Sequence, residues 1–221
     1  MRDFLALGID PLHPEGWIVQ KSLQALRRGE AILLPTVHGY VLCCDLASRK
    51  AAEALAQLAG PAGKNRSAGI GGRLLLAVPD LSTLSRYASL DDTAYRLLRG
   101  FLPGTGMFRL LARANVPRAL QTKRSILMRV PSEPLLQELL QSIEALVLLL
   151  PNGAWAEHEG PRQIQEVPAC IKTATTLHLL YEQERYGEDT RQATRFDLWD
   201  LTEREPTCIE IGAEEEQEAV Y

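Results

Sequence analysis

The chain has 221 residues, of which 46% are hydrophobic, and its formal net charge at pH 7 is −4. This apolar fraction is enough to build the core of one large domain, which excludes a wholly disordered chain. The first residues lack the features of a secretory signal, and no apolar run approaches the roughly 20 residues that span a bilayer, so we expect a cytoplasmic protein with no membrane partner.

Apolar periodicity predicts helices and strands that alternate along the chain. The predicted helices cover residues 16–28, 45–58, 81–88, 92–101 and 133–142. The predicted strands cover residues 30–35, 73–78, 107–112, 125–130, 145–150, 196–201 and 207–211. We expect Ser48 and Ser132 to cap two of the helices, and Gly29 to end the first one.

This alternation is typical of an α/β fold. We expect a single domain over residues 1–221, built on an open, twisted, mixed sheet that is flanked by helices. One further helix, broken near Pro168, is predicted over residues 164–185, as part of a helical excursion from the sheet at about 160–190. An acidic tail follows at residues 213–221.

The cysteines indicate no metal site and no disulfide framework. Cys43, Cys44, Cys170 and Cys208 form no C-x-x-C pair, and none has a histidine at metal-ligand spacing. We interpret Cys43 and Cys44 as packed core side chains and predict no metal bound by the protein itself.

The charges are distributed unevenly along the chain. Eight basic residues and no acidic residue lie between Arg96 and Arg129. A local basic surface can attract phosphates even on an acidic protein. The alternative is an ordinary solvated face.

Short motifs in a consistent order resemble the YrdC/YciO family. Residues 35–42, PTVHGYVL, resemble the family's P-T-D-T-x-Y-G-L, and Lys64-Asn65-Arg66 resembles its K-x-R. Residues 101–107, FLPGTGM, resemble W-P-G-P-x-T, and residues 125–131, SILMRVP, resemble T-x-G-x-R-x-P. Residues 149–153, LLPNG, stand where the family has T-S-A-N, and residues 197–202, DLWDLT, resemble its closing strand.

The resemblance implies a YrdC-like fold and a chemistry. The family joins L-threonine, bicarbonate and ATP, with Mg²⁺, into threonylcarbamoyl-adenylate for the modification of adenosine in tRNA. Such a reaction needs no covalent nucleophile, only positioning and charge neutralisation, so no catalytic residue is assigned. The residues that the resemblance places at the ligand are Thr36, His38, Tyr40, Lys64, Arg66, Ser125, Arg129 and Asn152.

Several of these residues have a structural alternative. Lys64 and Arg66, on a Gly-rich connection, suit a triphosphate or carboxylate, yet they are equally explained as solvated loop cations. Arg129 lies among apolar residues, so it either faces the pocket or forms a buried ion pair. Thr36 either binds the ligand or caps its own turn.

The remaining alternatives concern a loop histidine and an asparagine. His38 stands where the family has Thr and either binds phosphate, acts as an acid or base near neutral pH, or has no role. Asn152, before Gly153, either donates to a ligand or permits a tight turn.

Three family side chains are replaced: Leu150 stands for a Ser, Met107 for a Thr and Glu210 for an Arg. Each lost hydroxyl removes a hydrogen bond worth about 1 kcal/mol net. We therefore predict a divergent member that binds a nucleotide, tRNA or double-stranded RNA, with the family reaction lost or altered. The alternatives are an active L-threonylcarbamoyladenylate synthase that uses the substituted residues, and a non-catalytic partner-binding protein.

Overall fold

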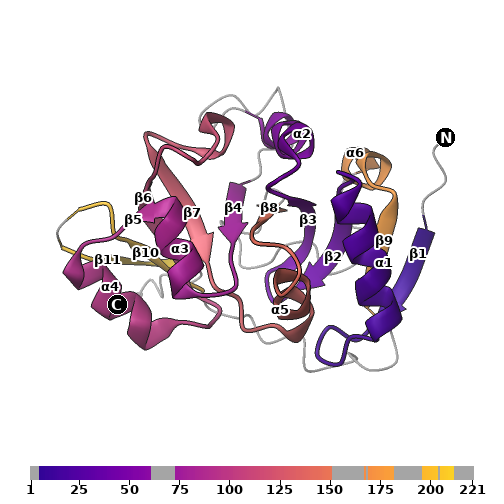
Figure 1. Ribbon diagram of the computed structural model, residues 1–221, viewed down its shortest axis with the longest axis horizontal. Coiled ribbons are helices and arrows are strands. Elements are labelled where there is room, and N and C mark those ends of the chain that lie inside the picture. The colour runs from indigo at the N-terminus through magenta and orange to yellow at the C-terminus, as the bar shows by residue number, and fades with distance from the viewer. Residues whose placement is uncertain are drawn as a thin grey trace, which may run out of the picture.

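The computed structural model in Figure 1 describes residues 5–60, 73–150, 167, 169–181, 196–203 and 205–211. The helices are α1 (Gly16–Arg27), α2 (Arg49–Ala59), α3 (Leu81–Tyr87), α4 (Asp92–Phe101), the 3-10 turn η2 (Arg118–Leu120), α5 (Pro134–Leu140) and α6 (Ala169–Ala174). The strands are β1 (Leu5–Ile9), β2 (Ile32–Thr36), β3 (Gly39–Asp45), β4 (Arg73–Ala77), β5 (Ala88–Ser89), β6 (Met107–Ala112), β7 (Ser125–Arg129), β8 (Leu146–Leu150), β9 (Leu177–Tyr181), β10 (Phe196–Asp200) and β11 (Thr207–Ile211).

The described strands form one mixed sheet that extends along the long axis of the molecule, from β1 at one end to β11 at the other (Figure 1). Its order is β1-β9-β2-β3-β8-β4-β7-β6-β10-β11, and β5 pairs with β6 off this path. The pairing is parallel between β4 and β7 and antiparallel between β3 and β8. The predicted open, mixed α/β sheet is therefore confirmed.

Helices cover both faces of the sheet, and each face has its own apolar core. On one face, α2, α3 and α4 contribute buried residues such as Leu55 to a cluster with Val147 and Leu149 of β8. On the other face, α1 and α5 pack against Leu146 and Leu148 of the same strand. Because β8 is buried on both sides, its sequence is apolar without alternation.

Local signals explain most helix boundaries. The first helix ends before Gly29, whose φ of 76° is a left-handed conformation that favours glycine. The side chains of Asp80 and Asp91 accept hydrogen bonds from Thr83 N and Ala94 N, which caps α3 and α4. Ser48 is the N-cap residue of α2, as predicted, although its side chain makes no capping hydrogen bond. The cap prediction at Ser132 is wrong, because the N-cap residue of α5 is Glu133.

Two predicted elements are corrected by the sheet topology. The helix predicted over 45–58 begins only at Arg49, because residues 39–45 form strand β3. The helix predicted over 164–185 is borne out at α6 but is wrong beyond Ala174, where α6 ends and β9 follows. Strand β9 lies between β1 and β2, parallel to both, and its Leu177 and Leu179 side chains are buried. The rest of the predicted 160–190 excursion, apart from these elements, and the 213–221 tail fall outside the described residues.

In the part of the chain that the structure describes, the helices are too short or too polar to cross a membrane.

Candidate functional site

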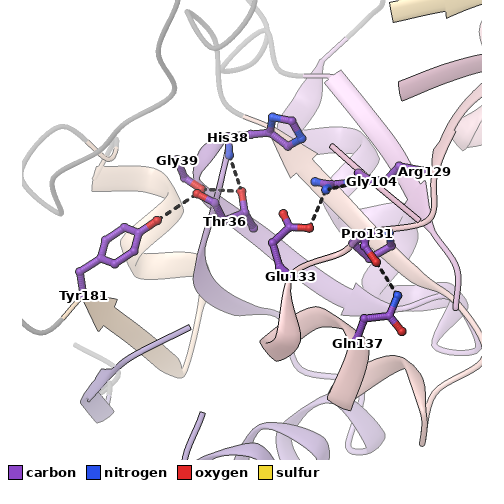
Figure 2. Close-up of polar contacts among 9 residues, drawn as sticks. All are labelled: Thr36, His38, Gly39, Gly104, Arg129, Pro131, Glu133, Gln137 and Tyr181. Carbon is purple, nitrogen blue, oxygen red and sulfur yellow. Dashed lines mark hydrogen bonds and ion pairs between the residues drawn. The ribbon is translucent and has the colours of Figure 1, made fainter. Parts of the chain in front are cut away.

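The family-like segment at residues 35–42 forms the hairpin between β2 and β3 (Figure 2). Thr36 pairs with Gly39, and Val37 and His38 form the turn between them. The Thr36 hydroxyl donates to the Gly39 carbonyl at 2.8 Å and accepts from the His38 amide at 3.1 Å. Thr36 thus holds its own turn, which is the structural alternative expected for this residue.

Strand β9 is tied to the same hairpin by a tyrosine pair. The Tyr40 hydroxyl accepts from the Tyr181 amide at 3.0 Å, and the Tyr181 hydroxyl donates to the Thr36 carbonyl at 2.9 Å. The two rings meet edge to face with centroids 5.4 Å apart. Burial raises the pKa of Tyr40. Tyr181 was missed in the sequence because its segment has helix-like apolar spacing.

Arg129 lies at the end of β7 and is 0% exposed. Its Nη2 donates to Glu133 Oε2 at 2.6 Å and to the Gly104 carbonyl at 3.2 Å (Figure 2). Gly104 belongs to the FLPGTGM motif and is held in place by its own amide, which donates to the Val130 carbonyl at 2.9 Å. Arg129 therefore forms the buried ion pair that was one of its two alternatives, and this pair lies beside the hairpin.

Glu133 was not among the residues predicted for the site. It directly precedes α5, and Pro134 is the first residue of that helix. The signal in the sequence is its position four residues after Arg129, across the strand end that Pro131 marks. That spacing became meaningful only once the turn brought the two side chains together.

The ion pair leaves polar atoms unsatisfied. Among the described residues, Arg129 Nε and Nη1 and Glu133 Oε1 are buried and have no hydrogen-bond partner. A buried polar atom without a partner costs about 1–3 kcal/mol, and more when it is charged. The pair thus presents two donors and one acceptor that a ligand or a water molecule can satisfy.

His38 is 3% exposed, and its ring lies near the Arg129 guanidinium (Figure 2). Burial, together with the positive charge of Arg129, holds the pKa of His38 well below its usual range. The imidazole is therefore neutral at pH 7 and offers no positive charge to a phosphate.

The lowered pKa of His38 predicts a dependence of stability on pH. The unfolded chain binds a proton at this histidine below about pH 6.5, whereas the folded protein does not, so stability falls as the pH is lowered. We expect the slope to rise toward about 1.4 kcal/mol per pH unit as the pH falls about one unit below 6.5. Burial also lowers the pKa of His178, so His38→Gln should remove only part of the total slope. The measurement is urea unfolding between about pH 5 and 7, and identical slopes for wild type and variant would contradict the prediction.

The other predicted residues lie elsewhere or outside the described part of the chain. Ser125 begins β7, about 13 Å along the strand from Arg129, and its hydroxyl donates to the Thr122 carbonyl at 2.6 Å. Lys64, Arg66 and Asn152 fall outside the described residues. The apolar replacements Met107 and Leu150 are 1% exposed and belong to the core against α1 and α5.

The basic stretch does not form one surface. Arg129 is buried, and the Nη1 of Arg109 donates to Asp200 at 2.9 Å. The six other cations are exposed: Arg96 and Arg99 on α4, and Arg113, Arg118, Lys123 and Arg124 between β6 and β7.

The described residues do not fit a Mg²⁺ ion held by the protein. They contain no cluster of three His, Cys, Asp or Glu side chains. The carboxylate at the site, Glu133, already pairs with Arg129.

Comparison with known proteins agrees with this geometry. The model of the Sua5/YciO/YrdC family, described as "Telomere recombination", matches residues 24–191. Uncharacterized protein YciO of Escherichia coli (strain K12) is 32% identical over 164 residues, which cover 72% of this chain and 76% of that protein.

Solved structures show the same fold. The crystal structure of E. coli YciO superposes with a TM-score of 0.70 at 27% identity, covering 96% of this chain and 97% of that one. P. abyssi Sua5 complexed with L-threonine also gives a TM-score of 0.70, at 18% identity, and covers 92% of this chain and 56% of Sua5. The family-model match spans most of the sequence, and the motifs at Thr36 and Arg129 lie within it. The chain belongs to the Sua5/YciO/YrdC family.

Proposed function

We propose that this chain is a cytoplasmic nucleotide-binding protein in which the synthesis of threonylcarbamoyl-adenylate is lost or greatly slowed. The observation that supports binding is the buried Arg129, which lies beside the Thr36 hairpin. Its Nε and Nη1 have no hydrogen-bond partner among the described residues. Buried guanidinium donors are strong binding groups for an acceptor atom of a ligand.

The loss of synthesis is supported by the contacts of the residues that stand at the family's motif positions. The hydroxyls of Thr36 and Ser125 are engaged in their own turns. Met107 and Leu150 are packed in the core and cannot donate a hydrogen bond. The reaction depends on donors that neutralise the charge developing on the phosphate, so their absence removes transition-state stabilisation.

Equilibrium binding and turnover test the proposal together. We expect ATP, with Mg²⁺, to bind saturably to the full chain, and Arg129→Lys to weaken that binding. Arg109→Lys is the matched control, because Arg109 lies on the neighbouring strand and pairs with Asp200 instead. With L-threonine and bicarbonate added, we expect no pyrophosphate release above the protein-free rate. Threonine-dependent release that Arg129→Lys abolishes would show an active synthase and overturn the proposal.

A second candidate function is RNA binding, and a specific surface favours it. The cations Arg113, Arg118, Lys123 and Arg124 are all exposed on the connection between β6 and β7, which carries no acidic residue. The Ala112 amide donates to the Arg124 carbonyl at 2.9 Å, so the two ends of this connection are adjacent. We call these four residues the basic connection, and propose that they contact the phosphates of double-stranded RNA.

The tip of the basic connection is strained. Lys123 and Arg124 both have positive φ, 51° and 67°, in a turn closed by hydrogen bonds between Thr122 and Ser125. Two central residues with positive φ define a type I′ turn, which favours Asn-Gly. A left-handed residue other than glycine costs about 1 kcal/mol or more. Strain retained at two exposed cations is typical of a functional surface.

The strain predicts opposite effects on stability and on binding. In the double variant Lys123→Asn/Arg124→Gly, we expect the free energy of unfolding to rise by about 1–2 kcal/mol, because the turn is relaxed. The affinity for a double-stranded RNA should fall by about tenfold or more at low salt, and the slope of log affinity against log salt should become shallower by up to about two units. Denaturant unfolding and fluorescence anisotropy at several salt concentrations measure the two effects.

Arg96→Gln/Arg99→Gln is the matched control, because it removes the same charge from α4. If the control lowers RNA affinity as much as the turn variant does, the effect comes from net charge and the basic connection is not the binding surface.

A further inference from the structure

The Arg129–Glu133 ion pair limits the kind of ligand group that can bind beside it. Arg129 is 0% exposed and Glu133 is 7% exposed, and Nη2 of the arginine donates to Oε2 of the glutamate at 2.6 Å. Both members retain buried atoms that lack partners among the described residues, namely Nε and Nη1 of Arg129 and Oε1 of Glu133. Retaining three such atoms in a buried place is unfavourable unless a bound group satisfies them.

Among the described residues, the local charge of this place is already balanced. The guanidinium contributes one positive charge and the carboxylate one negative charge, and His38 beside them is buried and neutral. A carboxylate or phosphate that entered would add a second anion to the buried pair. It would have to bind beside Glu133 or displace it, and each course leaves a buried negative charge without compensation.

An uncharged group with an acceptor beside a donor fits better. Its acceptor atom can receive a hydrogen bond from Nε or Nη1 of Arg129, while its N–H group donates to Oε1 of Glu133. A carboxamide, a urea and the edge of a nucleobase share this arrangement. Each of these groups satisfies Glu133 Oε1 and one of the two unpartnered donors of Arg129, and each leaves the ion pair intact.

We propose that Glu133 is a specificity-determining residue that makes the Arg129 subsite accept an uncharged amide-like group and reject carboxylate and phosphate. The inference rests on the proposed nucleotide pocket and deepens it, since it assigns this subsite to a neutral part of the ligand. The anionic part of a nucleotide then binds elsewhere.

The test uses two probes of equal size, acetamide and acetate, on the full chain. The readout is the ¹H–¹⁵N resonance of the Arg129 Nε–H group, identified by its loss in Arg129→Lys. In the wild type we expect acetamide to shift this resonance saturably and acetate to leave it unchanged. In Glu133→Gln, which keeps an acceptor for Nη2 but removes the negative charge, we expect acetate to bind at least tenfold more tightly than in the wild type.

Two further variants sharpen the comparison. Glu133→Asp keeps the negative charge and should keep the preference for acetamide. Glu138→Gln makes the same charge change on α5 away from Arg129 and should leave both probes unchanged. Adenosine and urea, as additional probes, distinguish a nucleobase from an amide source.

Acetate that binds equally well to the wild type and to Glu133→Gln would overturn the proposal. A resonance that neither probe shifts in any variant would also overturn it, since an ordered water then satisfies the three atoms. Even if Glu133→Gln does not fold, the comparison of acetamide with acetate on the wild type tests whether the subsite prefers the uncharged group. Failure of ATP binding with a positive acetamide response would refute the proposed function and leave the specificity of this subsite standing.

Discussion

Glu133→Ala is expected to lower the free energy of unfolding by about 3–5 kcal/mol, because it leaves the buried Arg129 without a counter-charge. Arg129 is 0% exposed, so water cannot replace the lost carboxylate without a rearrangement of the strand end. The Gly104 carbonyl at 3.2 Å is then its remaining hydrogen-bond acceptor among the described residues. Urea unfolding with a fixed m-value measures the loss.

Removing both charges should recover most of this loss. In Arg129→Met/Glu133→Leu, apolar side chains replace the pair, and such replacements are often neutral or stabilising. Glu138→Ala on the same helix is the control and should change stability by less than about 0.5 kcal/mol. If Glu133→Ala and Glu138→Ala destabilise equally, the ion pair has no net role in the fold. The same result would remove the physical basis for a charge-balanced subsite.

Phe108→Ala is expected to lower the free energy of unfolding by about 3–5 kcal/mol through loss of buried surface and formation of a cavity. Phe108 is 0% exposed and is the second residue of β6, where it is paired with Met128 of β7 and Trp199 of β10. Its ring belongs to the core beneath α2, α3 and α4. The effect should appear as a lower denaturant midpoint with little change in the m-value.

Leu111→Ala, on the same strand, provides the matched control. Leu111 is 43% exposed, so its truncation should cost less than about 1 kcal/mol. Equal losses at Phe108 and Leu111 would mean that the sheet does not continue from β7 through β6 to β10 in solution.

The two halves of the proposed function depend on separate parts of the molecule. The proposed ligand specificity depends on the Arg129 and Glu133 pair beside the β2–β3 hairpin, and the proposed RNA affinity depends on the basic connection between β6 and β7. Ser125 and Arg129 begin and end the same strand, β7, so the two surfaces lie toward opposite ends of it. A variant that alters one of them should therefore leave the other unchanged, because distant sites usually act additively.

The sequence by itself determined the α/β class, the helix and strand alternation and the order of the family motifs. These features follow from apolar periodicity and from residues such as Gly29, whose effect on the backbone is local. The prediction that Arg129 is buried with a partner or a ligand also follows, because a charge among apolar strand residues is costly alone.

Only the tertiary structure decided which groups meet. Residues 177–181 carry an apolar pattern that suits a helix or a buried strand, and the space between β1 and β2 selected the strand. That choice brought Tyr181 to Thr36, 145 residues away in sequence. Likewise, the sequence around Glu133 indicates only a polar residue at a helix start. Glu133 is the partner of Arg129 because the turn through Pro131 folds α5 back over the strand end. Local propensity is encoded in neighbouring residues, whereas the pairing of distant side chains depends on strand order and register, which the whole chain sets together.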